Sequence, residues 1–280
     1  LRCGLKPVLC DISINTFNSD YNLLLKNVSE KTLLVLAVHM FGITIKGIDK
    51  LRAALPADVY LVEDCAQSMG SSLNGKQSGT FSDVSFFSFG RGKNISLCAG
   101  GFIALGNKNL SAKIKKYLSS LRVTGGLKLL FWFISALSVT IVVNPRVYGI
   151  MHSYVKRFKE KKHRACHECL RFTPIQSHLG LRIFLRREEI FLSRYKNGIF
   201  LLKNLEAAQG LVIPVIEEES YPVFNRLPVI LKDPDKIGFI KSRLWDAGIE
   251  SSGLYDLPLH HIFNLGYNRE DFPVSCFLAR

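Results

Sequence analysis

Four residues of this chain have the types and the order that one kind of cofactor chemistry requires. Asp64 ends an apolar run, Gln67 follows three positions later, and Ser88 and Lys93 lie in a second apolar run and the glycine-flanked loop after it. A lysine amine can bind an aldehyde covalently, and an acid can keep a pyridine nitrogen protonated so that the ring accepts electrons. Together these residues indicate a site for pyridoxal phosphate (PLP).

Each of these residues also has an ordinary structural explanation. Asp64 could cap the next helix, Lys93 could be a solvated loop lysine, and Ser88 could be a turn hydroxyl bonded to its neighbours. Each explanation is reasonable for one residue alone. The occurrence of all four in this order favours the cofactor site.

The residues before Asp64 predict a β-α-β unit. Short apolar runs at 33–38 and 59–62 have the character of buried strands, and a helical pattern at 48–55 separates them. The helix is expected to end before Pro56, because proline cannot continue it. Strands that alternate with helices in this way are typical of a parallel sheet.

Two further strands are expected around the Lys93 loop, at 83–88 and 101–105. Open parallel sheets bind ligands beyond the carboxyl ends of their strands. Asp64 and Ser88 both lie at such ends. The predicted sheet therefore supports a site at the same place as the residue types do.

Three motifs carry a resemblance to a known family. Residues 63–67 read Glu-Asp-Cys-Ala-Gln, residues 70–83 hold spaced glycines and a closing aspartate, and residues 87–95 read Phe-Ser-Phe-Gly-Arg-Gly-Lys-Asn-Ile. This region resembles the DegT-type (DegT/StrS) PLP-dependent sugar aminotransferases. The similarity extends to flanking segments at 6–12, 38–42 and 172–180.

The resemblance implies an α/β protein with the PLP-dependent transferase fold of aspartate aminotransferase (type I). It implies a large PLP-binding domain with a mostly parallel sheet, of which residues 1–122 would be a part. Residues 123–168 would be a hydrophobic and basic insertion. Residues 169–280 would hold connecting helices and an incomplete small α+β domain.

The resemblance also implies roles for the four residues. Lys93 would be the Schiff-base lysine, Asp64 the partner of the pyridine nitrogen, Gln67 a neighbour of the ring's phenolic oxygen, and Ser88 a ligand of the cofactor phosphate. The implied reaction is amino transfer from glutamate to a nucleotide-linked keto-sugar, by a homodimer, for bacterial surface polysaccharide. Relatives that deoxygenate sugars lack this lysine, so Lys93 argues against dehydration.

Some positions depart from the family pattern. Ala99 stands where relatives have a carboxylate, Cys169 where they have an asparagine, and Arg91 where they have a small or turn-forming residue. Arg91 could bind a substrate phosphate or be solvated. The family has a phosphate-binding turn upstream of Leu1, so we expect a fragment that binds PLP weakly. The alternative function is a non-catalytic membrane-associated or scaffold protein that keeps the fold.

The net charge is +14, from 37 basic and 23 acidic residues. Such a charge suits nucleic acid, an anionic membrane or a phosphate-bearing substrate. No nucleic-acid module is evident, and the basic residues do not alternate with stacking aromatics, so nucleic-acid binding is not expected. Seven cysteines without regular spacing, and no secretory leader, predict a reducing cytoplasm.

A long apolar segment follows the predicted large domain. Residues 129–143 carry no charge, and residues 156–164 carry six positive charges and one negative. A spanning helix needs about 20 apolar residues, so a full crossing is not favoured. Two explanations remain: residues 127–151 contact the inner face of the membrane peripherally, or they form a buried or interface helix.

The remaining patterns concern the rest of the chain. Residues 163–169 could supply half of a zinc site, but no second ligand pair lies at the usual distance, so no metal is expected. The other predicted elements are a helix at 109–121, one or two helices at 174–205, a strand at 226–231, a helix from Asp233 to about Gly248, and a further strand reaching 255–259.

Overall fold

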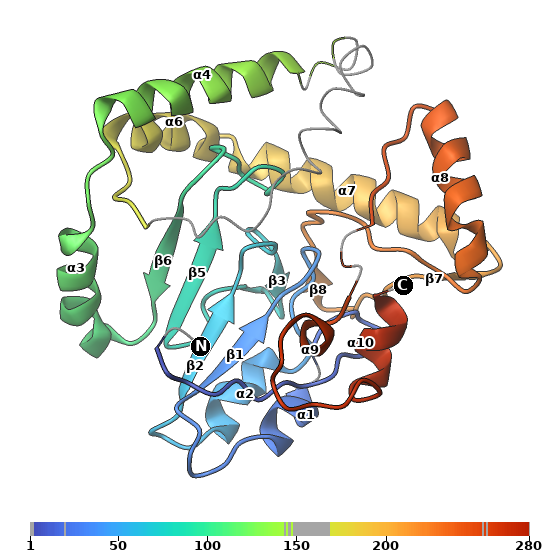
Figure 1. The fold of residues 1–280 in the computed structure, drawn as a ribbon, viewed down its shortest axis with the longest axis horizontal. Helices are drawn as coiled ribbons and strands as arrows, with labels where there is room; N and C mark the ends of the chain where they lie inside the picture. Colours follow the sequence, from blue (N-terminus) through green and yellow to red (C-terminus); the bar gives the residue numbers. More distant parts are fainter. Residues whose placement is uncertain are drawn as a thin grey trace.

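The structure is a computed structural model that describes residues 3–19, 21–142, 144, 147, 169–253, 255 and 257–279. A four-stranded sheet lies at its centre, in the order β1 (Leu34–Val38), β2 (Tyr60–Asp64), β5 (Val84–Ser88) and β6 (Gly101–Leu105) (Figure 1). The first three strands run parallel and β6 is antiparallel to β5. The expectation of a mostly parallel sheet is therefore confirmed.

Helix α2 (Ile48–Ala54) connects β1 to β2. Gly47 precedes it with a φ of 76°, a left-handed conformation that glycine adopts without steric cost. Ile48 and Leu51 are fully buried against the apolar side chains of β1 and β2. The helix ends before Pro56, as the sequence predicts, and its burial fixes the strand that delivers Asp64.

Two small sheets tie the second half of the chain to the first. In the first one, β3 (Ser72–Leu73) pairs with β4 (Lys76–Gln77) and with β8 (Ser220–Tyr221). The other joins β7 (Leu211–Val212) to β9 (Ile230–Leu231). The pairing of β3 with β8 brings residues near 220 to the loop that follows β2.

Helices surround the sheet (Figure 1). The helix that begins at Pro174 starts with a capping box, because the Thr173 hydroxyl accepts the N–H of Gln176 while the Gln176 side chain accepts the N–H of Thr173. The predicted segment 174–205 forms two helices. The described helices not yet named are α1 (Tyr21–Lys26), η1 (Lys108–Leu110), α3 (Ser111–Ser120), α4 (Gly126–Val142), α6 (Pro174–Phe184), α7 (Arg187–Leu205), η2 (Pro234–Lys236), α8 (Ile237–Asp246), α9 (Leu259–Ile262) and α10 (Pro273–Leu278).

Two predicted strands differ from the structure. The strand expected at 226–231 is confined to β9, because Pro228 has no N–H to donate to a neighbouring strand. The further strand expected to reach 255–259 is absent from the described residues there, and α9 begins at Leu259 instead. The prediction of a strand from the apolar character of that segment is therefore wrong.

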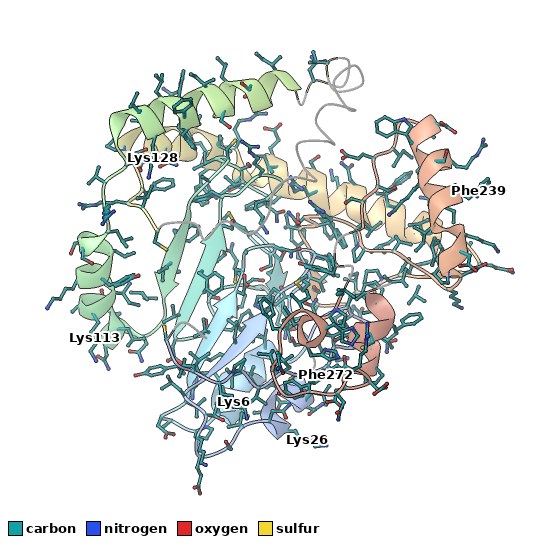
Figure 2. All side chains as sticks on the ribbon, viewed as in Figure 1. Lys6, Lys26, Lys113, Lys128, Phe239 and Phe272 are labelled. Atoms are coloured by element: carbon teal, nitrogen blue, oxygen red, sulfur yellow. The ribbon has the colours of Figure 1, made fainter. Side chains whose placement is uncertain are left out.

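The apolar segment forms helix α4, whose outer side is exposed. Its exposed side chains include Leu127 at 75% and Phe131 at 70%. In the described part of the chain, no helix combines the length and the apolar character needed to cross a membrane. Basic and apolar side chains both project outward elsewhere, such as Lys113 on α3 and Phe239 on α8 (Figure 2).

Candidate functional site

Asp64 and Ser88 end two adjacent parallel strands. Asp64 is the last residue of β2 and pairs with Phe86, while Ser88 is the last residue of β5. The Cys65 N–H then donates to the Phe86 carbonyl at 2.9 Å, which extends the pairing past Asp64. This register brings both residues to the same edge of the sheet, as the sequence predicts.

The Asp64 carboxylate is fixed by its own turn. Oδ1 accepts a hydrogen bond from the Ala66 N–H at 2.9 Å, and the side chain is half-buried. This turn leaves the second oxygen, Oδ2, available to another group. The sequence left a helix cap as the alternative role of Asp64, but the structure has a turn there and not a helix. The turn bond does not exclude a second role for the same carboxylate.

Lys93 lies in a loop that is closed at its base. The Phe89 N–H donates to the Gly100 carbonyl at 2.9 Å, and the Leu97 N–H donates to the Phe89 carbonyl at 2.8 Å. Inside the loop, the Lys93 N–H donates to the Gly90 carbonyl at 3.2 Å. The lysine is half-buried, so this loop does not simply present a solvated side chain.

The surroundings of Lys93 favour its neutral amine. Burial is the main cause that lowers the pKa of Lys93, and the guanidinium of Arg226 lowers it further. The carboxylate of Asp64 acts in the opposite direction and raises it. Asp64, Lys93 and Arg226 therefore lie within electrostatic reach of one another, and a lysine with a lowered pKa is a better nucleophile near neutral pH.

Ser88 and Lys93 border one small space. The Ser88 hydroxyl accepts the Gly90 N–H at 3.1 Å. A Cβ at position 90 would lie 3.2 Å from the Ser88 Oγ and 3.9 Å from the Lys93 Cγ, so glycine keeps this space open. A hydroxyl and a backbone N–H are donor types that a phosphate group takes.

Gln67 lies in the turn after Asp64, but its amide bonds elsewhere. Its Oε1 accepts the Phe41 N–H at 3.3 Å, and its Nε2 donates to the Tyr255 hydroxyl at 3.2 Å. The structure thus brings together Asp64, Ser88 and Lys93. Gln67 borders this group through the turn, but within the described residues its side chain bonds to Phe41, Met40 and Tyr255 instead of Lys93.

A distant segment completes the surroundings of Lys93. Asn94 donates to the carbonyls of Met69 and Val223 at 2.9 and 3.0 Å, and Asn225 donates to the Gly92 carbonyl at 2.6 Å. These bonds attach residues 223–226 to the Lys93 loop and so bring Arg226 beside it. Sequence reasoning missed Arg226, Asn94 and Asn225, because no spacing pattern relates residues about 130 positions apart.

A buried hydrogen-bonded pair supports the strand end from behind. The His39 Nε2 lies 2.9 Å from Glu63 Oε1, and both side chains are fully buried. The His39 Nδ1 accepts the Ile45 N–H at 3.0 Å, so its Nε2 carries the proton and donates to Glu63. Glu63 also accepts the N–H groups of Gly79 and Phe81. The pair therefore fixes the residue before Asp64, and Glu63 is a positioning residue that the sequence did not single out.

Helix α4 packs directly on the Lys93 loop. The Trp132 indole donates to the Leu97 carbonyl at 3.0 Å, and Arg91 donates to the Ser135 hydroxyl. Arg91 therefore binds α4 here, whereas the sequence left a substrate phosphate or solvent as its partner. The described start of the predicted insertion is thus joined to the candidate site; residues 156–164 and most of the proposed zinc half-site at 163–169 lie outside the described residues.

Comparison with known proteins agrees with this geometry. A family model described as the DegT/DnrJ/EryC1/StrS aminotransferase family matches residues 1–277. The lipopolysaccharide biosynthesis protein RfbH of Salmonella typhimurium is 26% identical over 86% of this chain and 54% of its own length. The GDP-perosamine synthase of Vibrio cholerae is 36% identical over 37% of this chain and 28% of its own length.

Solved structures share the fold. DesV of S. venezuelae, determined in complex with a ketimine intermediate, superposes with a TM-score of 0.72 at 21% identity, over 98% of this chain and 65% of that one. The chain thus spans between about half and two thirds of the length of RfbH and DesV. The PLP-dependent transferase fold expected from the sequence is confirmed.

Proposed function

Because the chain belongs to the DegT/DnrJ/EryC1/StrS aminotransferase family, we propose that it binds PLP through Lys93 and transfers an amino group to a nucleotide-linked keto-sugar. One observation carries this proposal: Lys93, with a lowered pKa, lies beside Asp64 and Ser88 at the carboxyl edge of the sheet. The residues present fit the cofactor, because they offer a nucleophilic amine, an acid and a phosphate cradle kept open by Gly90.

Each residue has a distinct task in the proposal. PLP would supply an aldehyde for covalent attachment and a ring that accepts electrons. Lys93 anchors it and, once displaced, carries a proton on its Nζ to and from the substrate carbon. Asp64 would keep the pyridine nitrogen protonated, Ser88 and the Gly90 N–H would bind the phosphate, and Gln67 would pack beside the ring.

The substrates follow from charge and from the relatives. A net charge of +14 favours a diphosphate-bearing sugar over a neutral one. Arg226 beside Lys93 is suited to the carboxylate of an amino-acid donor, for which we propose glutamate, because guanidinium binds carboxylate in a bidentate manner. The names of RfbH and GDP-perosamine synthase support a role in bacterial surface polysaccharide.

We propose that a second copy of the chain covers the exposed side of α4. Leu127, Phe131 and Leu137 on this helix are each more than half exposed, while Trp132 bonds the Lys93 loop. A homodimer through α4 would therefore set the position of that loop. Changing Leu127 and Phe131 to glutamate should shift the chain from dimer to monomer in sedimentation velocity. A dimer that survives this change would remove α4 from the interface.

The proposed compartment is the cytoplasm. Six cysteines in the described part of the chain are free, which suits a reducing compartment. Peripheral contact of residues 127–151 with the inner face of the membrane is the other use of the same apolar side. Flotation with anionic liposomes distinguishes dimerisation through α4 from membrane contact. A chain that only dimerises stays at the bottom of the gradient, whereas a chain bound to liposomes floats.

Borohydride reduction followed by peptide mapping tests the cofactor site. The chain is incubated with PLP, reduced and digested. We expect a pyridoxyl group on Lys93 and none in Lys93→Ala, with Lys128→Ala as the lysine control, which keeps the label on Lys93. An unmodified Lys93 would favour the non-catalytic scaffold instead.

A further inference from the structure

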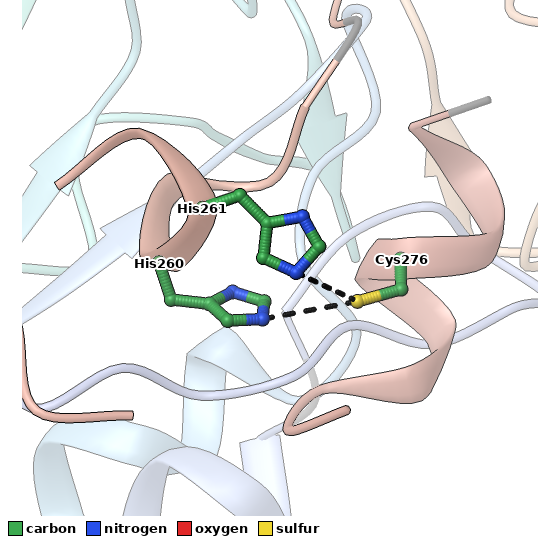
Figure 3. Close-up of side chains that lie close together, drawn as sticks. All are labelled: His260, His261 and Cys276. Atoms are coloured by element: carbon green, nitrogen blue, oxygen red, sulfur yellow. Dashed lines mark hydrogen bonds between the residues drawn. The ribbon is translucent and has the colours of Figure 1, made fainter. Parts of the chain in front are cut away.

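Three metal-ligating side chains converge at the C-terminal end of the described chain. His260 and His261 lie on α9, and Cys276 lies on α10 (Figure 3). The Cys276 Sγ is 3.8 Å from the His260 Nε2 and 3.9 Å from the His261 Nε2. All three ligand atoms lie within 4.8 Å of one another. Histidine nitrogen and cysteine sulfur are the atoms that zinc prefers.

The spacing of these atoms is close to that of a tetrahedral zinc site. Zinc bonds of about 2.0–2.1 Å to nitrogen and about 2.3 Å to sulfur place neighbouring nitrogen and sulfur ligands about 3.5 Å apart. The observed distances exceed this by only a few tenths of an ångström. Side-chain rotations alone would therefore bring the three atoms to bonding distance from one ion.

The Arg269 carbonyl oxygen lies where a fourth ligand would lie. It is 2.8 Å from the His261 Nε2, 3.4 Å from the His260 Nε2 and 3.6 Å from the Cys276 Sγ. Without a metal, the Nε2 groups of His260 and His261 share this oxygen, while the Cys276 thiol has a second acceptor in the Asp271 carbonyl at 3.5 Å. A cation at the centre would let all four atoms act as ligands through their lone pairs.

From this arrangement, we propose that His260, His261 and Cys276 bind one Zn²⁺, with the Arg269 carbonyl or a water in the fourth position. The site would be structural. It joins two short helices that have little internal stability of their own, and it belongs to a different part of the fold from Lys93 and Asp64.

The surroundings of the cluster are already fixed by contacts with the start of the chain. Asp11 accepts the N–H groups of Val274 and Ser275 at 3.0 and 2.8 Å, which holds α10 in place. The His260 ring packs edge-on against Phe272, with ring centres 5.0 Å apart. The ligands therefore need little ordering when the ion binds, which favours affinity.

A second cluster in the described residues does not qualify. His39, Glu63 and Cys65 also lie close together, but the His39 and Glu63 atoms are already occupied by each other and by backbone N–H groups. Burial, with the charge of Glu63, raises the pKa of the Cys65 thiol well above its ordinary range, so the thiolate that zinc needs is disfavoured. At the C-terminal end, the Nε2 groups of His260 and His261 instead lie against a backbone carbonyl, that of Arg269.

Titration with Co²⁺, a coloured substitute for zinc, tests the proposal on the full chain under reducing conditions. We expect one equivalent to give visible bands and a thiolate-to-cobalt charge-transfer band, both removed by added Zn²⁺. Cys276→Ser should abolish the charge-transfer band. Because even outer partners of a metal site cost about 10–100-fold in affinity, His260→Ala and His261→Ala should weaken binding by at least about ten-fold.

Matched controls separate this site from other cysteines and histidines. Cys169→Ser and His178→Ala change exposed residues away from the cluster and should leave the spectrum as it is. A charge-transfer band that persists in Cys276→Ser, or no band in the unchanged chain, would overturn the proposal. Zinc should also protect Cys276 from alkylation in the unchanged chain, which needs no variant; equal alkylation with and without zinc would count against the site.

Discussion

The carboxylate of Glu63, the residue before Asp64, lies 2.9 Å from the imidazole of His39, and both side chains are fully buried. Each oxygen of Glu63 also accepts a backbone N–H, from Gly79 or Phe81. The pair thus connects the end of β2 to the two loops beside it. Removing the pair should therefore disturb the candidate site indirectly, by destabilising the fold around it.

Replacing Glu63 by alanine should strongly destabilise the protein. It leaves His39 and two N–H groups buried without their partner, and each buried donor left unpaired in this way costs about 1–3 kcal/mol. Urea unfolding measures the change in the free energy of unfolding. Glu218→Ala, at an exposed position, should change it by about 0.5 kcal/mol or less. Equal effects of the two variants would refute the structural role of Glu63.

The same pair should make the free energy of unfolding depend on pH in the acidic range. Burial alone would raise the pKa of Glu63, but the hydrogen bonds and charge of its partners, led by His39, outweigh it and lower the pKa. The folded state therefore binds fewer protons than the unfolded state between the two pKa values. The contribution of Glu63 to the free energy of unfolding is complete above the ordinary pKa of a glutamate. It is lost as the pH falls through the lowered pKa of Glu63 in the folded state. Urea unfolding at several acidic pH values should show that the free energy of unfolding falls less steeply with decreasing pH in Glu63→Gln than in the unchanged chain.

The pKa of Lys93 should respond in opposite directions to its two charged neighbours. Arg226→Gln removes a nearby positive charge and should raise this pKa, whereas Asp64→Asn removes a negative one and should lower it. NMR titration of reductively methylated lysines, with Lys93→Arg to assign the signal, measures the shift. Shifts of the same sign in both variants would show that Lys93 does not lie between these charges.

The space beside Ser88 should be sensitive to a single methyl group. Gly90→Ala places a Cβ 3.2 Å from the Ser88 Oγ, where the proposed phosphate binds, and should weaken PLP binding by about ten-fold, the loss of roughly 1.4 kcal/mol. Absorbance of the lysine-bound cofactor measures the affinity. Gly125→Ala, which meets no atom within 4 Å, is the control. Unchanged affinity in Gly90→Ala would exclude the cradle.

Much of the sheet and the first part of the site could be predicted from the sequence. The apolar runs before Asp64 and Ser88 show local patterns, and the parallel topology then brings their ends together. Arg226 could not be found in this way, since its position depends on Asn225 and Asn94 bonding across the fold. The domain boundaries at 122 and 168 and the cofactor roles of the four residues stay predictions.

Local sequence patterns also could not predict that β6 is antiparallel or that β9 is only two residues long. Residues 101–105 have the same apolar character in either direction, so only the short Lys93 loop, closed by the bond of Phe89 to Gly100, decides it. Residues 226–231 look like a strand in composition. Pro228 nevertheless has no N–H to donate to a neighbouring strand, and only Ile230 and Leu231 pair with β7.

The contact of Asp11 with Ser275 has a consequence for synthesis of the chain. The two residues are separated by 264 positions, so Asp11 leaves the ribosome long before its partner exists. Until then the Asp11 carboxylate remains hydrated, and residues 7–12 lack the helix on which they finally dock. Docking of α10 should therefore be among the last events of folding during translation.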